Sequence, residues 1–182
     1  IRVRLFVAIQ LPEVIKDTLT AMCGGVDDAH WQERGQLHLT LRFIGEVDGA
    51  VAHDIDDVLY QISAPAFSLI LRRTGFFNKR KLARVLWAGV EDDTALRHLH
   101  KKIQHSLTAI GLEPERHRYH PHVTLARLSG LDPMEAEGYA ARYGEYASPP
   151  FIVDRFCLFS SQLSRGGAIH TLEAEYLLAQ ED

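Results

Sequence analysis

The sequence has little of three features that would point to particular classes of protein. No hydrophobic run approaches the roughly 20 apolar residues of a membrane-spanning helix, so we expect no membrane association. Only two cysteines are present, Cys23 and Cys157, far apart and among apolar neighbours, which favours two reduced thiols over a disulfide. There is no excess of positive charge, because the net charge is −4. An anionic ligand would therefore need a local basic patch.

The composition is that of a soluble globular protein. It is 46% hydrophobic and 24% charged over 182 residues, which fits one domain of ordinary size. The basic and apolar stretch Arg2–Ile9 is too short for a signal peptide, and no small-residue cleavage site follows it before Pro12. We expect a cytoplasmic protein that acts as a monomer.

A short pattern occurs twice in the chain. The sequence His-x-Thr-Leu begins at His38 and again at His122, 84 residues later. One His-x-Thr carries no weight, because this composition gives about 0.4 occurrences by chance. The surroundings of the two motifs repeat as well, and that repetition makes the pair significant.

Hydrophobic periodicity and helix-start signals predict the same order of elements around each motif: strand, helix, motif strand, helix, strand. Besides the motifs, the predicted elements are a strand at 3–9, a helix opened by Pro12, a helix near 51–62, a strand at 66–71, a strand at 84–90, a helix near 96–110, a helix opened by Asp132-Pro133 and a strand at 151–158. We therefore predict an internal repeat of about residues 2–74 and 84–160, within one domain spanning 1–182. A last strand, about 170–178, is expected to pair back onto one lobe.

Side chains alternate between the two faces of a strand. On the first motif strand, the predicted core face carries Leu37, Leu39, Leu41 and Phe43. The opposite face carries His38, Thr40 and Arg42. On the second, His122 and Thr124 lie opposite the buried Val123 and Leu125. Two lobes related by an approximate two-fold axis would bring both polar faces to one cleft.

Two imidazoles on opposite sides of a cleft suit displacement at phosphorus. Such a displacement needs a nucleophile entering in line with the oxygen that departs. Because histidine titrates near neutral pH, one ring can act as base while the other acts as acid. Threonine hydroxyls can donate to the oxygens on which charge develops. A single His beside a Thr is usually an ordinary half-exposed sheet residue, but a matched pair in a repeated frame favours catalysis.

The residues around both motifs resemble a known family. His38–Val47 (HLTLRFIGEV) and Pro121–Arg127 (PHVTLAR) are similar to the paired signatures of the two-histidine (2H) phosphoesterases, and most similar to the RNA 2′,3′-cyclic phosphodiesterases, also called 2′-5′ RNA ligases or LigT-like proteins. The stretches 2–9 and 83–90 resemble further typical segments. The resemblance covers about residues 2–160.

This resemblance implies an α+β fold of two lobes whose mainly antiparallel sheets line a central cleft, with helices outside. It implies hydrolysis of an RNA terminal 2′,3′-cyclic phosphate to a 2′-phosphomonoester without metal or other cofactor, and in some members the reverse joining of RNA ends. His38 would be the general acid that protonates the 3′ oxygen, and His122 the base that activates water. The phosphate oxygens would be held by Thr40, Thr124 and Arg127, the arginine five residues after the second histidine.

Strand alternation conflicts with the place of that arginine. In a regular strand, Arg127 would point away from the His122 face and into the core, where an unpaired guanidinium is costly. A bulge can turn the following side chains to the other face. We therefore expect a break in regularity near Ala126.

One basic segment stands out in this acidic protein. Residues 72–84 hold six Lys or Arg residues around two phenylalanines. Either this segment contacts RNA phosphates and stacks a base, or it is a solvated hairpin connection. The candidate RNA-binding residues, on this segment and on the first motif strand, are Arg42, Phe77, Arg80, Lys81 and Arg84.

Other functions remain open from the sequence. The chain could be a phosphodiesterase for small cyclic nucleotides or for ADP-ribose cyclic phosphate, and no residue pattern excludes this. It could be a non-catalytic RNA- or nucleotide-binding module, although both motifs are intact. A zinc site among His117, His120 and His122 is disfavoured, because no standard ligand spacing is present. The expected partners are RNA ends with a 2′,3′-cyclic phosphate or small cyclic nucleotides.

Overall fold

A computed structural model describes residues 1–180, which contain ten strands, four α-helices and one 3-10 helix. In chain order the elements are β1 (Arg2–Gln10), α1 (Glu13–Ala21), β2 (Ala29–Trp31), η1 (Arg34–Gln36), β3 (His38–Asp48), α2 (Gly49–Tyr60), β4 (Phe67–Leu69), β5 (Leu71–Lys79), β6 (Leu82–Val90), α3 (Thr94–Ala109), β7 (Val123–Leu131), α4 (Pro133–Arg142), β8 (Phe151–Val153), β9 (Arg155–Ser164) and β10 (Gly167–Leu177).

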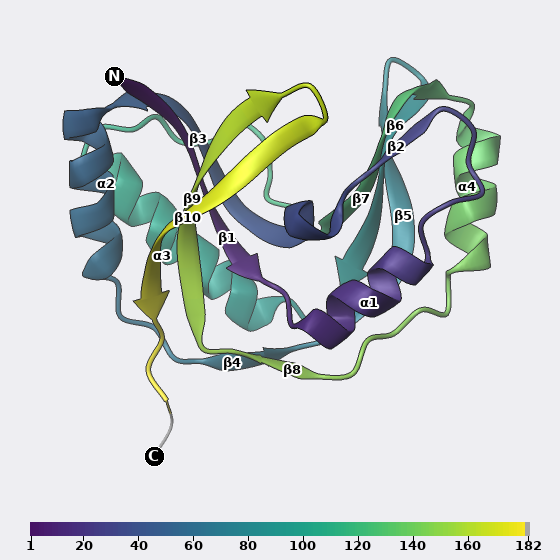
Figure 1. Cartoon of the computed structure of the whole chain (residues 1–182). Coiled ribbons are helices and arrows are strands. Elements are labelled where there is room, and N and C mark those ends of the chain that lie inside the picture. Colours follow the sequence, from purple (N-terminus) through teal and green to yellow (C-terminus); the bar gives the residue numbers. More distant parts are fainter. Residues whose placement is uncertain (181–182) are drawn as a thin grey trace.

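The main sheet runs in the order β10-β9-β1-β3-β7-β6-β5, with β2 paired to β7. Its strand pairings are antiparallel, so the predicted α+β class is confirmed. In the middle of the path, β3 and β7 are joined by a single register pair, Leu39 with Val123. The sheet therefore opens into two lobes (Figure 1). We call them the β1–β3 lobe, with β9 and β10, and the β6–β7 lobe, with β5 and β2.

The predicted order of elements is present in both halves. The first half runs β1, α1, β3, α2, β4, and the second runs β6, α3, β7, α4, β8. Two predicted strands are interrupted, after Leu69 and after Val153, because β4 and β8 pair with each other as a separate two-stranded ribbon. The basic segment forms β5 and a tight turn at Arg80 and Lys81, both with positive φ (54° and 66°), so it is a β5–β6 hairpin.

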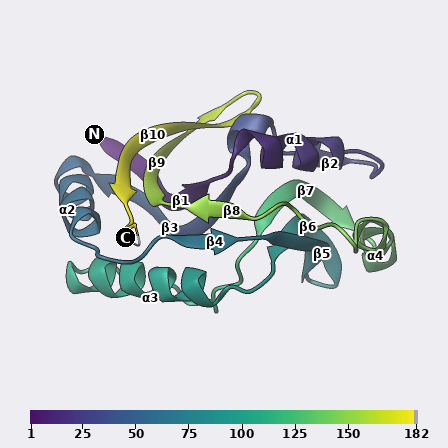
Figure 2. The same ribbon diagram turned by 90° about the horizontal axis from the view of Figure 1, so that it is seen from below.

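Each helix buries an apolar stripe against the sheet. In α3 the stripe is fully buried and consists of Leu96, Leu99, Ile103 and Leu107. This helix packs against α2 and β3, whereas α1 lies on the side of the β6–β7 lobe (Figures 1 and 2). The helix that follows the first strand of each half thus covers the lobe of the other half. A continuous hydrophobic core results, reaching from β1 to α4.

Three smaller expectations, on the cap of α4, the cysteines and the last strand, are also confirmed. The side chain of Asp132 accepts a hydrogen bond from the Met134 backbone N–H and so caps α4, with Pro133 in its first turn. Cys157 is buried and Cys23 half-buried, and both are free thiols. Strand β10 pairs with β9, as expected for the last strand. Across residues 1–180, no helix combines the length and apolar character needed to cross a membrane.

Candidate active site

The first motif strand contains a bulge. In the β1–β3 pairing, Val7 faces Arg42 and Ala8 faces Thr40, which leaves Leu41 without a partner. Leu41 and Arg42 are therefore both buried, and Phe43 is turned out with 61% of its surface exposed. Simple alternation was wrong beyond Thr40, since it placed Arg42 beside His38 and Phe43 in the core.

The second motif strand contains the same bulge. In the β6–β7 pairing, Leu86 faces Ala126 and Trp87 faces Thr124, which leaves Leu125 without a partner. Leu125 and Ala126 are both fully buried, and Arg127 is exposed on the face that carries Thr124. The break in regularity expected near Ala126 is confirmed.

Arg42 is committed to the interior. Its guanidinium donates hydrogen bonds to the side-chain oxygen of Gln104 in α3 and to the backbone carbonyl of Glu113. Its Nε lies 3.6 Å from a carboxylate oxygen of Glu115. Burial lowers the pKa of Arg42, which the Glu115 carboxylate partly opposes. The residue is only 5% exposed and does not line the cleft, so placing it among the RNA-contacting residues was wrong. Instead it ties β3 to the segment leading to the second motif.

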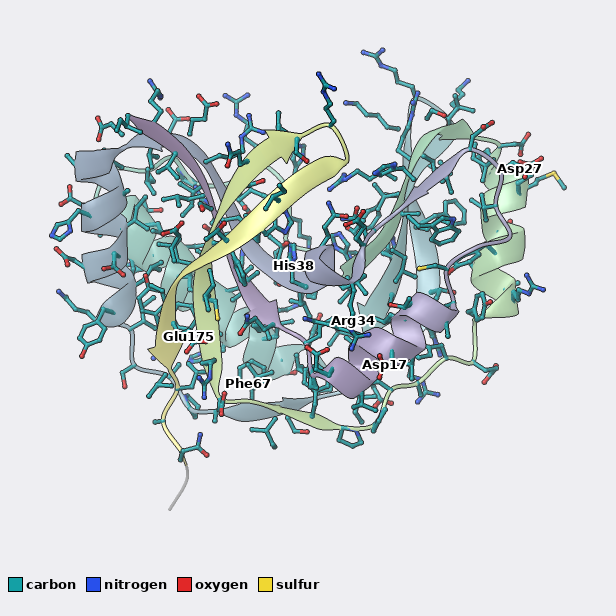
Figure 3. The ribbon with its side chains drawn as sticks, viewed as in Figure 1. Asp17, Asp27, Arg34, His38, Phe67 and Glu175 are labelled. Carbon is teal, nitrogen blue, oxygen red and sulfur yellow. The ribbon has the colours of Figure 1, made fainter. Side chains whose placement is uncertain are left out.

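Both motifs line one cleft of about 600 Å³ between the lobes. The structure brings together at this cleft all the residues predicted for acid–base chemistry and phosphate binding, namely His38, Thr40, His122, Thr124 and Arg127. Figure 3 shows His38 near the middle of the molecule, between the β9–β10 hairpin and the β6–β7 lobe. The volume of the cleft is within the range of small-molecule sites.

His38 lies in an aromatic environment. Its ring stacks on Phe6, with 4.8 Å between centroids, and more distantly on Phe159 at 6.1 Å. Burial is the largest cause that lowers the pKa of His38 to about 3, and electrostatic interactions with His170, Lys16 and Arg127 contribute to the lowering. In the free protein His38 is thus neutral at neutral pH. A bound anion would act in the opposite direction and favour its protonation.

His122 is held through its Nδ1 atom. This atom lies 2.7 Å from the backbone carbonyl of His120, and a carbonyl can only accept, so Nδ1 carries the proton. The Nε2 lone pair of the neutral ring is then free to take a proton. Phe77 packs edge-on against the ring at 4.9 Å. Burial lowers the pKa of His122, while its hydrogen bond to His120 raises it.

The segment before His122 also contacts the first motif. The Tyr119 hydroxyl donates to the backbone carbonyl of Thr40 at 2.9 Å, and burial raises the pKa of this phenol. The Tyr119 ring stacks on His100 with 3.9 Å between centroids, and Arg97 donates to its carbonyl. The two motifs are therefore connected through side chains as well as through the Leu39–Val123 pair.

The other candidates for RNA contact lie at different places. Phe77 lines the cleft. Arg80 and Lys81 are exposed at the tip of the β5–β6 hairpin, outside the cleft lining. Arg84 donates to the Ser129 carbonyl at 2.8 Å, which ties its guanidinium to β7.

The sequence did not identify several cleft residues. They are Phe6, His30, Gln32, Gln36, Phe43 and His170. Phe43 could have been found by applying the bulge expected near Ala126 to the first motif, 84 residues earlier. His170 carried no signal, because its strand contains no motif. Among residues 1–180, no three His, Cys, Asp or Glu side chains gather as a metal site would require.

The chain is similar to known proteins over nearly its whole length. Residues 6–165 match the sequence profile of the 2′-5′ RNA ligase superfamily. A protein of Aeropyrum pernix named RNA 2′,3′-cyclic phosphodiesterase is 41% identical over 105 residues, covering 57% of this chain and 60% of the relative. A protein of the same name from Geobacillus stearothermophilus is 27% identical over 188 residues, covering all of this chain and 59% of the relative. This chain therefore matches about 60% of the length of these two relatives.

The fold is also similar to that of a solved structure. Escherichia coli LigT, crystallised in complex with 3′-AMP, superposes with a TM-score of 0.81 at 25% identity, covering 99% of this chain and all of LigT. The profile match over residues 6–165 is consistent with the structure, which has two lobes and paired His-x-Thr strands at one cleft. The chain belongs to the 2′-5′ RNA ligase superfamily.

Proposed function

We propose that this protein is a hydrolase that converts the terminal 2′,3′-cyclic phosphate of RNA to a 2′-phosphomonoester. The observation that carries the proposal is that both His-x-Thr motifs and Arg127 line a single cleft. The names of the relatives agree with it. A small cyclic nucleotide would meet the same groups and is the second candidate substrate.

In the proposed reaction, water attacks the phosphorus in line with the 3′ oxygen. His122 takes the proton from the water through Nε2 as the new P–O bond forms. The bond from phosphorus to the 3′ oxygen breaks, and His38 donates a proton to that oxygen. Thr40, Thr124 and Arg127 hold the non-bridging oxygens, on which charge increases in the transition state. The product keeps the phosphate on the 2′ oxygen, and each histidine ends in the other's starting protonation state.

Two features support the division of roles. The hydrogen bond from Nδ1 of His122 to the His120 carbonyl leaves a lone pair on Nε2, as a base requires. His38 is neutral in the free protein, so an acid role requires that the ring take up a proton from solvent when the substrate binds. The negative phosphate supplies the opposite charge that favours protonation of a buried imidazole. His38 would thus become the acid only in the complex.

We extend the proposal to the rest of the protein. One two-lobed domain would span residues 1–182, with an internal repeat of about 2–74 and 84–160. The protein would act as a cytoplasmic monomer. The exposed β5–β6 hairpin tip at Arg80 and Lys81 would contact RNA upstream of the terminal nucleotide, with Phe77 and Arg84 nearer the cleft. The reverse reaction, with a 5′ hydroxyl in place of water, would join RNA ends through a 2′,5′ linkage.

The test is turnover of a short RNA ending in a 2′,3′-cyclic phosphate, with EDTA present and the 2′ and 3′ product isomers resolved. We expect the 2′-phosphomonoester alone and full activity under chelation. Small 2′,3′-cyclic nucleotides and ADP-ribose cyclic phosphate serve as competing substrates. A higher kcat/KM for either would overturn the RNA assignment. Activity lost with EDTA and restored by zinc or manganese would overturn the two-histidine mechanism.

A further inference from the structure

A third histidine lies beside His38 in the cleft. His170 is on β10, the edge strand of the β1–β3 lobe. Its ring is edge-on to His38, with 5.0 Å between centroids, and edge-on to Phe6 at 4.8 Å. In the strand order, β9 lies beside β1 as β5 lies beside β6, and β10 lies one strand further out, where the β6–β7 lobe has none because its remaining strand, β2, pairs with β7. His170 thus has no partner at an equivalent place in the second motif's lobe, and none of the roles above uses it.

The register of β10 fixes the direction of this side chain. His170 pairs with Ser161 of β9, and both residues line the cleft. Ala168, two residues before His170, lines it too, as the two-residue period of a strand requires. The neighbours Ile169 and Thr171 are exposed and do not line the cleft. His170 therefore faces the cleft because of the sheet pairing rather than through one rotamer.

The two ring nitrogens of His170 lie in different environments. Nδ1 is buried and has no hydrogen-bond partner among the described residues. A proton on Nδ1 would be a buried donor without an acceptor, which is unfavourable. The neutral ring therefore carries its proton on Nε2, the nitrogen left for the cleft. Burial also lowers the pKa of His170, so the ring is neutral at neutral pH.

This tautomer is the opposite of the one found at His122. There the proton is on Nδ1, held by the His120 carbonyl, and Nε2 presents a lone pair. At His170, Nε2 presents an N–H group. A neutral donor suits this position, because it binds an oxygen of an anion without placing a second positive charge beside His38. A cation there would oppose the protonation that His38 needs as an acid.

We propose that His170 is a substrate-binding residue that donates a hydrogen bond from Nε2 to a phosphate oxygen on the His38 side of the cleft. This proposal rests on the proposed function, because it takes the cyclic phosphate as the anion in the cleft. The β1–β3 lobe then supplies a neutral donor where the β6–β7 lobe supplies the Arg127 guanidinium. The phosphate is held from both sides.

Two substitutions separate hydrogen bonding from packing. His170→Phe keeps an aromatic ring against Phe6 and removes both nitrogens, whereas His170→Gln keeps a donor near the position of Nε2. We expect the Phe variant to lose kcat/KM on the order of 10²-fold, mainly in kcat, since one donor to a developing charge is removed. The Gln variant should recover most of that loss. Thr171→Val, on the outer face of the same strand, is the matched control and should equal the wild type.

Stability distinguishes binding from a structural role. Because His170→Phe removes a buried nitrogen without a partner, its melting temperature should equal or exceed that of the wild type. A Phe variant with lower activity and unchanged or raised melting temperature supports the proposal. A Phe variant with wild-type kcat/KM overturns it, as does a loss of activity that only follows a lower melting temperature.

A second readout does not depend on turnover. The Kd of inorganic phosphate, measured by calorimetry, should rise in His170→Phe and return toward the wild-type value in His170→Gln. If the wild type fails to cleave the RNA substrate but shows this pattern with phosphate, the proposed function fails and the role of His170 stands. If the wild type cleaves the substrate and both readouts are unchanged in the Phe variant, the role of His170 fails alone.

Discussion

The two motif strands have the same backbone irregularity but carry different side chains just after it. Both carry a bulge that leaves Leu41 and Leu125 unpaired, and both turn the next exposed residue toward the cleft. That residue is Phe43 on β3 and Arg127 on β7, again 84 positions apart. Matched backbones with an aromatic ring on one side and a cation on the other predict an asymmetric ligand, anionic toward Arg127 and apolar toward Phe43.

The surroundings of the two histidines also differ, being aromatic on the β1–β3 side and more polar on the β6–β7 side. His38 is packed by Phe6, Phe159 and His170, whereas His122 is oriented by a backbone carbonyl. Burial lowers both pKa values, and that of His38 falls to about 3. The neighbours thus give the two histidines of the repeated motifs different pKa values, as a pair of one acid and one base requires.

The largest expected effect comes from removing either histidine. His38→Ala and His122→Ala should each lower kcat/KM on the order of 10²–10⁴-fold, and the double variant should lose less than the product of the two. A substrate whose leaving group needs no protonation separates the roles in steady-state assays. It should rescue the His38 variant and leave the His122 variant inactive. Rescue of the His122 variant alone would reverse the assignment.

Replacing the cation that distinguishes the lobes should have the next largest effect. Arg127→Gln removes a charged hydrogen bond to the phosphate and should lower kcat/KM by about 10–100-fold, in line with the free energy of such bonds. Arg72→Gln changes the net charge equally on an exposed residue paired with Glu91, outside the cleft, and serves as control. Equal losses in both variants would mean that only overall charge matters.

The pKa difference between the histidines predicts a pH dependence. As pH falls, His122 should be protonated before His38 in the free enzyme, which ¹⁵N-detected titration of the imidazoles can measure. The productive form has His38 protonated and His122 neutral, so kcat/KM should peak below pH 6.5. The optimum for kcat should lie higher, because bound phosphate raises the pKa of His38. An optimum of kcat/KM above pH 7 would contradict the burial of both rings.

The smallest effect is expected at the hairpin tip. Arg80→Ala and Lys81→Ala should each reduce the slope of log K against log salt by about 0.7 for single-stranded RNA, the value for one phosphate contact. The same variants should bind a mononucleotide cyclic phosphate as the wild type does, since the tip lies outside the cleft lining. An unchanged slope with long RNA would support a solvated turn.

The sequence was sufficient for the features that depend on local patterns. The helix α3, the cap at Asp132 and the order of elements in each half are local, and the structure has them, although α3 ends one residue before Ile110, which is exposed. The sequence was insufficient where pairing with another strand determines which way a side chain points. The bulge on β3 exists in its pairing with β1, and this pairing turns Arg42 inward to Gln104 and Glu115. His170 reaches the cleft only because β10 pairs with β9.

The exchanged positions of α1 and α3 have a consequence for how the chain folds. Each of these two helices packs against the lobe made by the other half of the chain. Neither half alone can therefore bury the apolar stripe of its own helix. Pairing over such sequence separations is slow and cooperative. We expect fragments divided between Arg80 and Lys81 to stay unfolded when separate and to regain a compact form when mixed. Folding and the assembly of the paired histidines would then be a single event.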